Sequence, residues 1–94
     1  MTKSKIIEVL KSKKDAYCLK NFILFGSVAN GTNTNDSDID IAYIENEKVR
    51  LNYDNYLKLE DELKKIFNAK IDLINYKKFN PLIKLHSQKE FIYV

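Results

Sequence analysis

The residues of this chain that are best suited to chemistry are aspartates set in short apolar segments. Asp38 and Asp40 alternate with Ile39 and Ile41. Alternate side chains of an extended chain point to opposite faces, so the two carboxylates should project together, about 7 Å apart, while the isoleucines enter a core. Carboxylates at this spacing can converge on a pair of divalent ions held roughly 4 Å apart, which promotes in-line phosphoryl displacement. The pattern therefore predicts a metal site.

A third aspartate and a glycine-serine turn accompany this pair. Asp72 interrupts the apolar run 71–74, where an isolated acid has little structural purpose. Gly26 and Ser27 follow another apolar run, residues 22–25, and ten residues separate Ser27 from the aspartate pair. Glycine at the end of a buried strand lets the backbone approach a ligand closely, and the amides that open a following helix attract an anion. Together these features indicate a site for a phosphorylated ligand.

Each of these features also has an ordinary structural interpretation. Ser27 alone could be the N-cap of a short helix, and Asp72 could be an acid on a strand edge. The aspartate pair could be a solvated strand face or, with Asn33, Asn35 and Asp36, part of a calcium loop. The loop lacks the central glycine and the closing glutamate of an EF-hand, which argues against calcium. The combination at this spacing favours the functional interpretation.

The string Gly26-Ser27, a spacer and then Asp-hydrophobic-Asp-hydrophobic at residues 38–41 resembles the signature of the DNA polymerase beta-like nucleotidyltransferase superfamily. The short chain, and Asp72 within Ile-Asp-Leu-Ile, are most similar to the minimal nucleotidyltransferases, or MNT proteins. These proteins are commonly paired with a HEPN-domain partner, often as the antitoxin of a toxin–antitoxin system. The motifs cover about residues 20–76.

The resemblance implies nucleotidyl transfer assisted by two metal ions. Asp38 and Asp40 would ligate both Mg²⁺ ions, with Mn²⁺ as a substitute. Asp72 would complete the ion nearer the attacking hydroxyl and lower the pKa of that hydroxyl, or act as its general base. The reaction would move AMP, or another nucleoside monophosphate, from ATP or another nucleoside triphosphate to a hydroxyl of a HEPN ribonuclease toxin.

The resemblance also implies a nucleotide-binding turn, and here the chain departs from the family. Gly26 and Ser27 would hold the triphosphate. Many MNT sequences continue Gly-Ser-x-Ala-Arg-Gly, whereas this chain has Asn30 in place of the arginine. A positive partner for phosphate is lost, although Asn30 can still donate a hydrogen bond. We therefore keep the alternative that the chain is a catalytically weak or inactive antitoxin, which neutralises its HEPN partner by binding alone.

Length and charge are consistent with a small enzyme that acts on another molecule. Ninety-four residues correspond to one domain, residues 1–94, so the acceptor should belong to a partner. Sixteen basic and thirteen acidic residues give a net charge of +3, which is too balanced to indicate direct nucleic-acid binding. The six tyrosines are many for this length, and we expect some of Tyr53, Tyr56, Tyr76 and Tyr93 to form an association surface, with core packing as the alternative.

The remaining composition points to a reducing compartment. Cys18 is the single cysteine, so no disulfide can form within the chain, and a cytoplasmic location is expected. Its side chain should be a small buried apolar group. The longest apolar run, residues 22–25, is far shorter than the roughly 20 residues needed to span a bilayer, so we expect no membrane association.

The apolar spacing predicts an alternation of helices and strands. The expected order is a helix at 3–16, a strand at 22–25, a short helix at 27–31, a strand at 38–44, a helix through 56–67 opened by Asn52 or Asp54, a strand at 71–74, a helix from Pro81 to about Lys89, and an apolar tail at 91–94 that can add a strand. This order predicts an α/β (α+β) fold, a small sheet with helices packed on one side. The resemblance implies the small polymerase beta-like nucleotidyltransferase fold, with a short mixed sheet.

Overall fold

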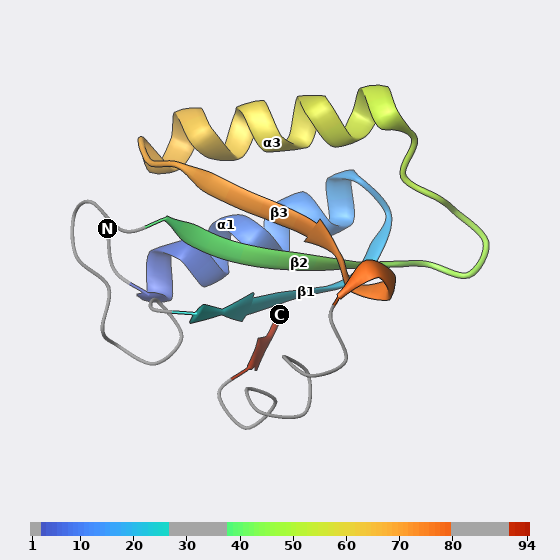
Figure 1. Cartoon of the computed structure of the whole chain (residues 1–94), viewed down its shortest axis with the longest axis horizontal. Coiled ribbons are helices and arrows are strands. Elements are labelled where there is room, and N and C mark those ends of the chain that lie inside the picture. The colour runs from blue at the N-terminus through green and yellow to red at the C-terminus, as the bar shows by residue number, and fades with distance from the viewer. Residues whose placement is uncertain (1–2, 27–37, 80–90) are drawn as a thin grey trace.

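The chain forms a four-stranded sheet with two long helices, as seen in a computed structural model that describes residues 3–26, 38–79 and 91–94 (Figure 1). In chain order the elements are α1 (Lys3–Ala16), β1 (Leu19–Phe25), β2 (Ile39–Glu45), α3 (Tyr53–Phe67), β3 (Ile71–Asn75), the 3-10 turn η1 (Tyr76–Lys78) and β4 (Ile92–Tyr93). The expected helices at 27–31 and 81–89 lie outside the described residues.

The sheet is mixed, with the strand order β3-β2-β1-β4. Strand β1 is antiparallel to β2 and to β4, whereas β2 and β3 are parallel. Parallel neighbours need a crossover connection, and α3 supplies it. The apolar tail closes the other edge, where the amide of Val94 donates to the carbonyl of Phe22 at 2.8 Å. The prediction that the tail adds a strand is confirmed.

One face of the sheet packs against both long helices. The buried residues there include Ile6 and Leu10 of α1, Phe22 and Leu24 of β1, Ile39, Ile41 and Tyr43 of β2, Leu59, Leu63 and Phe67 of α3, and Ile71 and Leu73 of β3. Burying a side chain of this size contributes about 1.5–3 kcal/mol. Because the strand residues in this cluster alternate along the chain, their neighbours point to the opposite face. The predicted fold, with a short mixed sheet and helices on one side, is confirmed for the described residues.

The residues that cap α3 determine where this helix begins and ends. The side chain of Asn52 accepts a hydrogen bond from the amide of Asn55 at 2.8 Å, which is an N-cap. Asn68 ends the helix in the left-handed conformation, with φ of 50°. The choice of Asn52 as a possible cap is therefore confirmed. The helix begins at Tyr53, three residues before Tyr56, the first apolar position that the sequence indicated. The N-cap at Asn52, and not the apolar spacing, determines where the helix starts.

Two expectations near the end of α1 are wrong. Strand β1 begins at Leu19 rather than at Phe22, because its first residues pair with the end of β2 even though they are not continuously apolar. Cys18 is exposed rather than buried, and it has a φ of 55°. It lies in the tight turn between α1 and β1, where the chain reverses direction at the surface.

The opposite face of the sheet carries a smaller apolar cluster. Ile23, Ala42, Phe79 and Phe91 are buried there, and the rings of Phe25 and Phe79 meet edge to face at 4.9 Å between centroids. No helix among the described residues has the length and apolar character that a bilayer crossing demands.

Candidate active site

Asp40 and Asp72 lie side by side on neighbouring strands. The parallel register of β2 and β3 sets Asp40 opposite Asp72, and paired strands are about 4.8 Å apart. Ile41 and Leu73, which follow them, are buried in the cluster against the helices. Since side chains alternate along a strand, both aspartates project from the face that the two long helices leave uncovered.

Asp38 joins this pair from the residue before β2. It is exposed, whereas Asp40 is half-buried, and its position two residues before Asp40 places it at the same end of the strand. Burial raises the pKa of Asp40, and the negative charges of Asp72 and Asp38 raise it further. The three carboxylates predicted from the sequence are thus within electrostatic range of one another at one end of the sheet.

Gly26 packs directly against this group. It follows β1, whose last residue, Phe25, pairs with Asp40. Its φ is +72°, a conformation that side chains other than glycine rarely adopt, and a Cβ at this position would overlap the Asp40 carboxylate, with Cγ at 3.0 Å. The predicted glycine turn and the aspartates therefore meet. Ser27 and Asn30, the other two predicted nucleotide-binding residues, lie outside the described residues.

The aspartates supply oxygen ligands of the kind that Mg²⁺ prefers, but they do not form a complete coordination site. Within 3–26, 38–79 and 91–94, no three His, Cys, Asp or Glu side chains, Asp38, Asp40 and Asp72 included, are grouped so that they could hold a metal ion by themselves. Mg²⁺ prefers oxygen ligands and is often held by one or two carboxylates together with water and substrate phosphates. The residues present fit such a shared site, and a cation would relieve the repulsion that helps to raise the pKa of Asp40.

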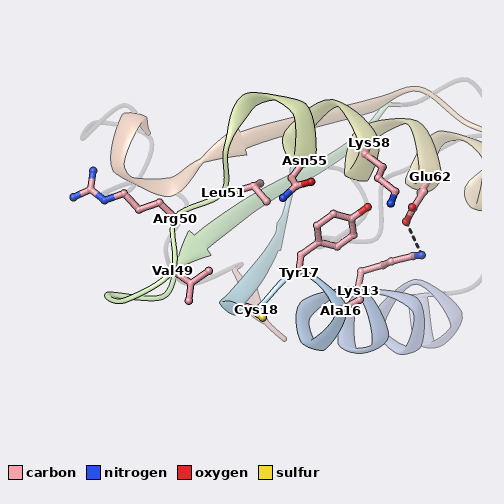
Figure 2. Close-up of a pocket in the computed structure, with 10 residues that line it drawn as sticks. All are labelled: Lys13, Ala16, Tyr17, Cys18, Val49, Arg50, Leu51, Asn55, Lys58 and Glu62. Atoms are coloured by element: carbon pink, nitrogen blue, oxygen red, sulfur yellow. Dashed lines mark hydrogen bonds and ion pairs between the residues drawn. The ribbon is translucent and has the colours of Figure 1, made fainter.

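Two cavities lie away from the aspartates. The first, of about 390 Å³, lies between the end of α1, the loop before α3 and α3 itself (Figure 2). Lys13 on α1 and Glu62 on α3 form an ion pair across it at 2.7 Å. The Tyr17 hydroxyl is buried there beside the carboxylate of Glu62. Burial and the neighbouring Glu62 raise the pKa of Tyr17 to about 12.

The second cavity, of about 470 Å³, lies beside β3 and the start of α3 and is lined by three tyrosines, Tyr43, Tyr53 and Tyr56. The sequence indicated that some tyrosines would gather on a surface. It did not indicate that Tyr43, from the strand that carries Asp40, would join two tyrosines of α3.

Comparison with known proteins gives the family. The sequence profile of the family "Polymerase beta, Nucleotidyltransferase" matches residues 4–94. A protein of Methanocaldococcus jannaschii, named as a candidate protein adenylyltransferase, is 40% identical over 98 residues, covering 99% of this chain and 98% of the relative. A second protein of that organism, named in the same way, is 34% identical over 98 residues, again covering 99% of this chain and 98% of the relative.

Solved structures agree with the fold. A candidate minimal nucleotidyltransferase, 21% identical, superposes with a TM-score of 0.74 over 98% of this chain and 95% of its own. A toxin–antitoxin structure with AMP-PNP, 26% identical, gives a TM-score of 0.65 over 88% of this chain, which spans 64% of that chain. With a profile match over nearly its whole length and close relatives covered end to end, the chain belongs to the polymerase beta nucleotidyltransferase family.

Proposed function

We propose that this chain is an antitoxin that transfers AMP, or another nucleoside monophosphate, from ATP or another nucleoside triphosphate to a hydroxyl of a HEPN ribonuclease toxin. The observation that carries the proposal is the pairing of Asp40 with Asp72, with Gly26 packed against Asp40. The names of the relatives support protein adenylylation, and the similarity to a toxin–antitoxin structure with AMP-PNP supports the nucleotide and the partner.

The proposed reaction is a displacement at the α-phosphorus of the nucleotide. The acceptor hydroxyl oxygen forms a bond to this phosphorus, the bond from the phosphorus to the oxygen that bridges to the β-phosphate breaks, and pyrophosphate leaves. The hydroxyl proton passes to the carboxylate of Asp72, directly or through water. Asp38 and Asp40, with Asp72, would hold Mg²⁺ or Mn²⁺, which supplies positive charge to the attacking and leaving oxygens.

The glycine-serine turn would position the triphosphate. Because Gly26 has no side chain, the Asp40 carboxylate packs directly against its backbone, which brings the turn next to the aspartates proposed to bind metal. Ser27 would donate its hydroxyl to a terminal phosphate, and the amide of Asn30 would donate where many relatives have an arginine. This arrangement keeps the anionic nucleotide next to carboxylates, so a divalent cation must bind with it.

A second candidate function is neutralisation of the HEPN partner by contact alone. The observation that favours it is Asn30 itself, because an amide offers no charge to offset the triphosphate. In that case nucleotide binding is weak and the aspartates have no catalytic role.

Transfer of label from ATP distinguishes these functions. The purified chain is incubated with its proposed HEPN partner, Mg²⁺, and ATP labelled at either the α- or the γ-phosphate. Nucleotidyl transfer predicts that the α-label becomes attached to the partner, that the γ-label does not, and that chelation of Mg²⁺ abolishes the signal. Attachment of the γ-label would show phosphorylation instead, and attachment of neither label would leave binding alone.

A further inference from the structure

The loop before α3 and the first turns of α3 carry an exposed apolar surface. Three of the five large apolar side chains that lie exposed in the described part of the chain come from residues 49–57. They are Val49, Tyr53 and Leu57, which are 44%, 72% and 43% exposed. Tyr53 and Leu57 are four residues apart on α3, so they share a face of the helix. A concentration of large apolar side chains on a surface indicates a place of association.

A cavity lined by tyrosines opens beside this surface. It is the second cavity, of about 470 Å³, with Tyr43, Tyr53 and Tyr56 in its lining, and we call it the tyrosine cavity. Tyr53 stacks on Tyr56 with 6.4 Å between ring centroids and 21° between ring planes. The Tyr56 hydroxyl donates to the carbonyl of Leu73 at 2.7 Å, which fixes this ring against β3. Because Tyr53 is mostly exposed, the stacked pair presents an open aromatic surface.

The tyrosine cavity lies in a negative electrostatic field. Burial, together with the charges of Glu60 and Asp72, raises the pKa of Tyr56 to about 12. Burial and the charge of Glu45 raise the pKa of Tyr43. Carboxylates that disfavour a phenolate favour a cation at the same place, because the sign of the interaction reverses. The face of an aromatic ring also attracts cations. A positive group is therefore the occupant that the cavity fits.

Two lysines near the cavity leave this field in place. Lys78 lines the cavity and Lys64 pairs with Glu60 at 3.0 Å, and both lysine side chains are exposed. Exposed ammonium groups are strongly hydrated and are screened by salt. The charges that shift the pKa values of Tyr43 and Tyr56 are those of carboxylates. A cation that sheds its water more easily than an ammonium can therefore still gain from the tyrosine rings.

Arg50 is the single arginine among the sixteen basic residues of the chain. It is exposed, and in Figure 2 its guanidinium points away from the ion pair of Lys13 and Glu62. The ion pairs found among residues 3–26, 38–79 and 91–94 are made by lysines, so none of them uses Arg50. A guanidinium is planar, is more weakly hydrated than an ammonium and stacks on aromatic rings. Arg50 thus has the chemistry that the tyrosine cavity favours.

We propose that two copies of this chain associate through this surface, with Arg50 of each copy stacked on Tyr53 of the other. A two-fold symmetric interface needs a patch that is complementary to itself, because each contact occurs twice. Arg50 directly precedes Leu51, which lines the tyrosine cavity, so one patch carries both the cation and the aromatic rings. Val49 and Leu57 add exposed apolar area. The inference concerns assembly and does not depend on nucleotidyl transfer.

Sedimentation equilibrium of the purified chain tests the association. The mass of one chain is 11.0 kDa. We expect the average mass to rise toward twice this value between about 10 µM and about 1 mM, the range over which a modest interface fills. Arg50→Gln and Tyr53→Ala each remove two contacts per dimer, so each should raise the dissociation constant about tenfold. The mass of one chain at every concentration, or a dissociation constant that neither change affects, would overturn the proposal.

A mixture of the two variants tests the reciprocal arrangement. Each variant alone loses both contacts between arginine and tyrosine. A mixed dimer keeps one of them, because Arg50 of the Tyr53→Ala copy still meets Tyr53 of the Arg50→Gln copy. Equal amounts of the two variants should therefore associate more tightly than either variant does alone. A mixture that associates no better than its components would contradict the two-fold arrangement.

Matched changes away from this surface should leave the association unchanged. Lys11→Gln removes an exposed positive charge from α1, which contributes nothing to the lining of the tyrosine cavity. Ile66→Ala removes a side chain that is 40% exposed and lies roughly 20 Å further along α3 than Tyr53. If these controls weaken the dimer as much as Arg50→Gln and Tyr53→Ala do, the contact is non-specific and the proposal is wrong.

The negative field and the identity of the occupant are tested in the same way. Glu60→Gln should weaken the dimer, whereas Asp61→Asn, which breaks the neighbouring ion pair with Lys65, should not. Equal effects of these two changes would contradict the role given to the field. If the chain stays monomeric and Tyr53→Ala instead weakens binding of the proposed HEPN partner, this surface belongs to that partner and the proposal fails.

Discussion

Asp40 is the aspartate whose surroundings the fold controls most closely. It pairs with Phe25 on one side and with Asp72 on the other, and Gly26 lies against its carboxylate. Only glycine satisfies both requirements at position 26, a positive φ and no Cβ. Gly26, which opens the proposed nucleotide-binding turn, and Asp40, which is proposed to bind metal, thus depend on each other.

Gly26→Ala should destabilise the chain by about 1–3 kcal/mol, because alanine is strained at positive φ and its Cβ would overlap the Asp40 carboxylate. Chemical denaturation measures the loss. The same change in an Asp40→Ala background should cost less, since the overlap is removed and only the backbone strain remains. Equal costs in the two backgrounds would show that contact with the carboxylate is unimportant.

Replacing the carboxylates by amides should not destabilise the fold. Burial and the charges of Asp72 and Asp38 raise the pKa of Asp40, so the charged form is disfavoured in the folded state. The contribution of Asp40 to stability is then most favourable below the ordinary carboxyl pKa of about 4 and is lost as the pH rises through the raised pKa.

We therefore expect the double variant Asp38→Asn, Asp40→Asn to have a thermal midpoint at neutral pH that is equal to that of the parent or higher. Any gain should disappear near pH 3. Asp54→Asn, in the exposed first turn of α3, is the matched control. A large fall in the midpoint of the double variant would assign the aspartates a structural role.

At the level of the elements, one ion pair joins the two long helices. The Lys13 ammonium donates to the Glu62 carboxylate at 2.7 Å, and both side chains are partly shielded from solvent. The hydrogen bond from Lys13 is the main cause of the lowered pKa of Glu62. The stabilisation is therefore present above the ordinary glutamate pKa and is lost as the pH falls through the lowered one.

Lys13→Met should lower the free energy of unfolding at pH 7 by about 0.2–1 kcal/mol, the usual range for a partly exposed pair. Lys65→Met removes an exposed pair with Asp61 within α3 and should cost less. Urea denaturation at pH 7 and at pH 3 measures both variants. An equal loss for Lys13→Met at the two pH values would show that the lysine acts through packing and not through Glu62.

The elements also show what the sequence could and could not predict. Helix α1 and the order of strands follow from the apolar spacing, because that spacing reflects which side chains the core buries. The register that sets Asp40 beside Asp72 could not be read in this way, since it depends on a parallel pairing formed across the whole of α3. The bond from Tyr56 to Leu73 is likewise a long-range contact without a local signal.

The error at Cys18 has a similar origin. A lone free cysteine is usually a small buried group, but here the residue occupies a turn with φ of 55° and is exposed. Local sequence gave no sign of this turn, because the residues around it contain neither glycine nor proline. The connection between α1 and β1 determines the exposure of Cys18.

At the level of the whole molecule, the helices that stabilise the sheet and the aspartates proposed for chemistry lie on opposite faces of the sheet. Both long helices pack on one face of the sheet, whereas the aspartates project from the other. A partner that approaches the uncovered face could present a hydroxyl to the aspartates without displacing the helices that stabilise the sheet, so loss of chemistry and loss of stability should be separable by mutation.

The most direct test of the central claim is the intact mass of the proposed HEPN partner after incubation with this chain, ATP and Mg²⁺. The account predicts that the partner gains one or more AMP units. It also predicts that the Asp38→Asn, Asp40→Asn variant still binds the partner but adds none, and that it no longer protects cells from the toxin. If no nucleotide produces a mass shift and the variant protects cells as well as the parent does, the chain acts by contact alone and the assignment as an enzyme is wrong.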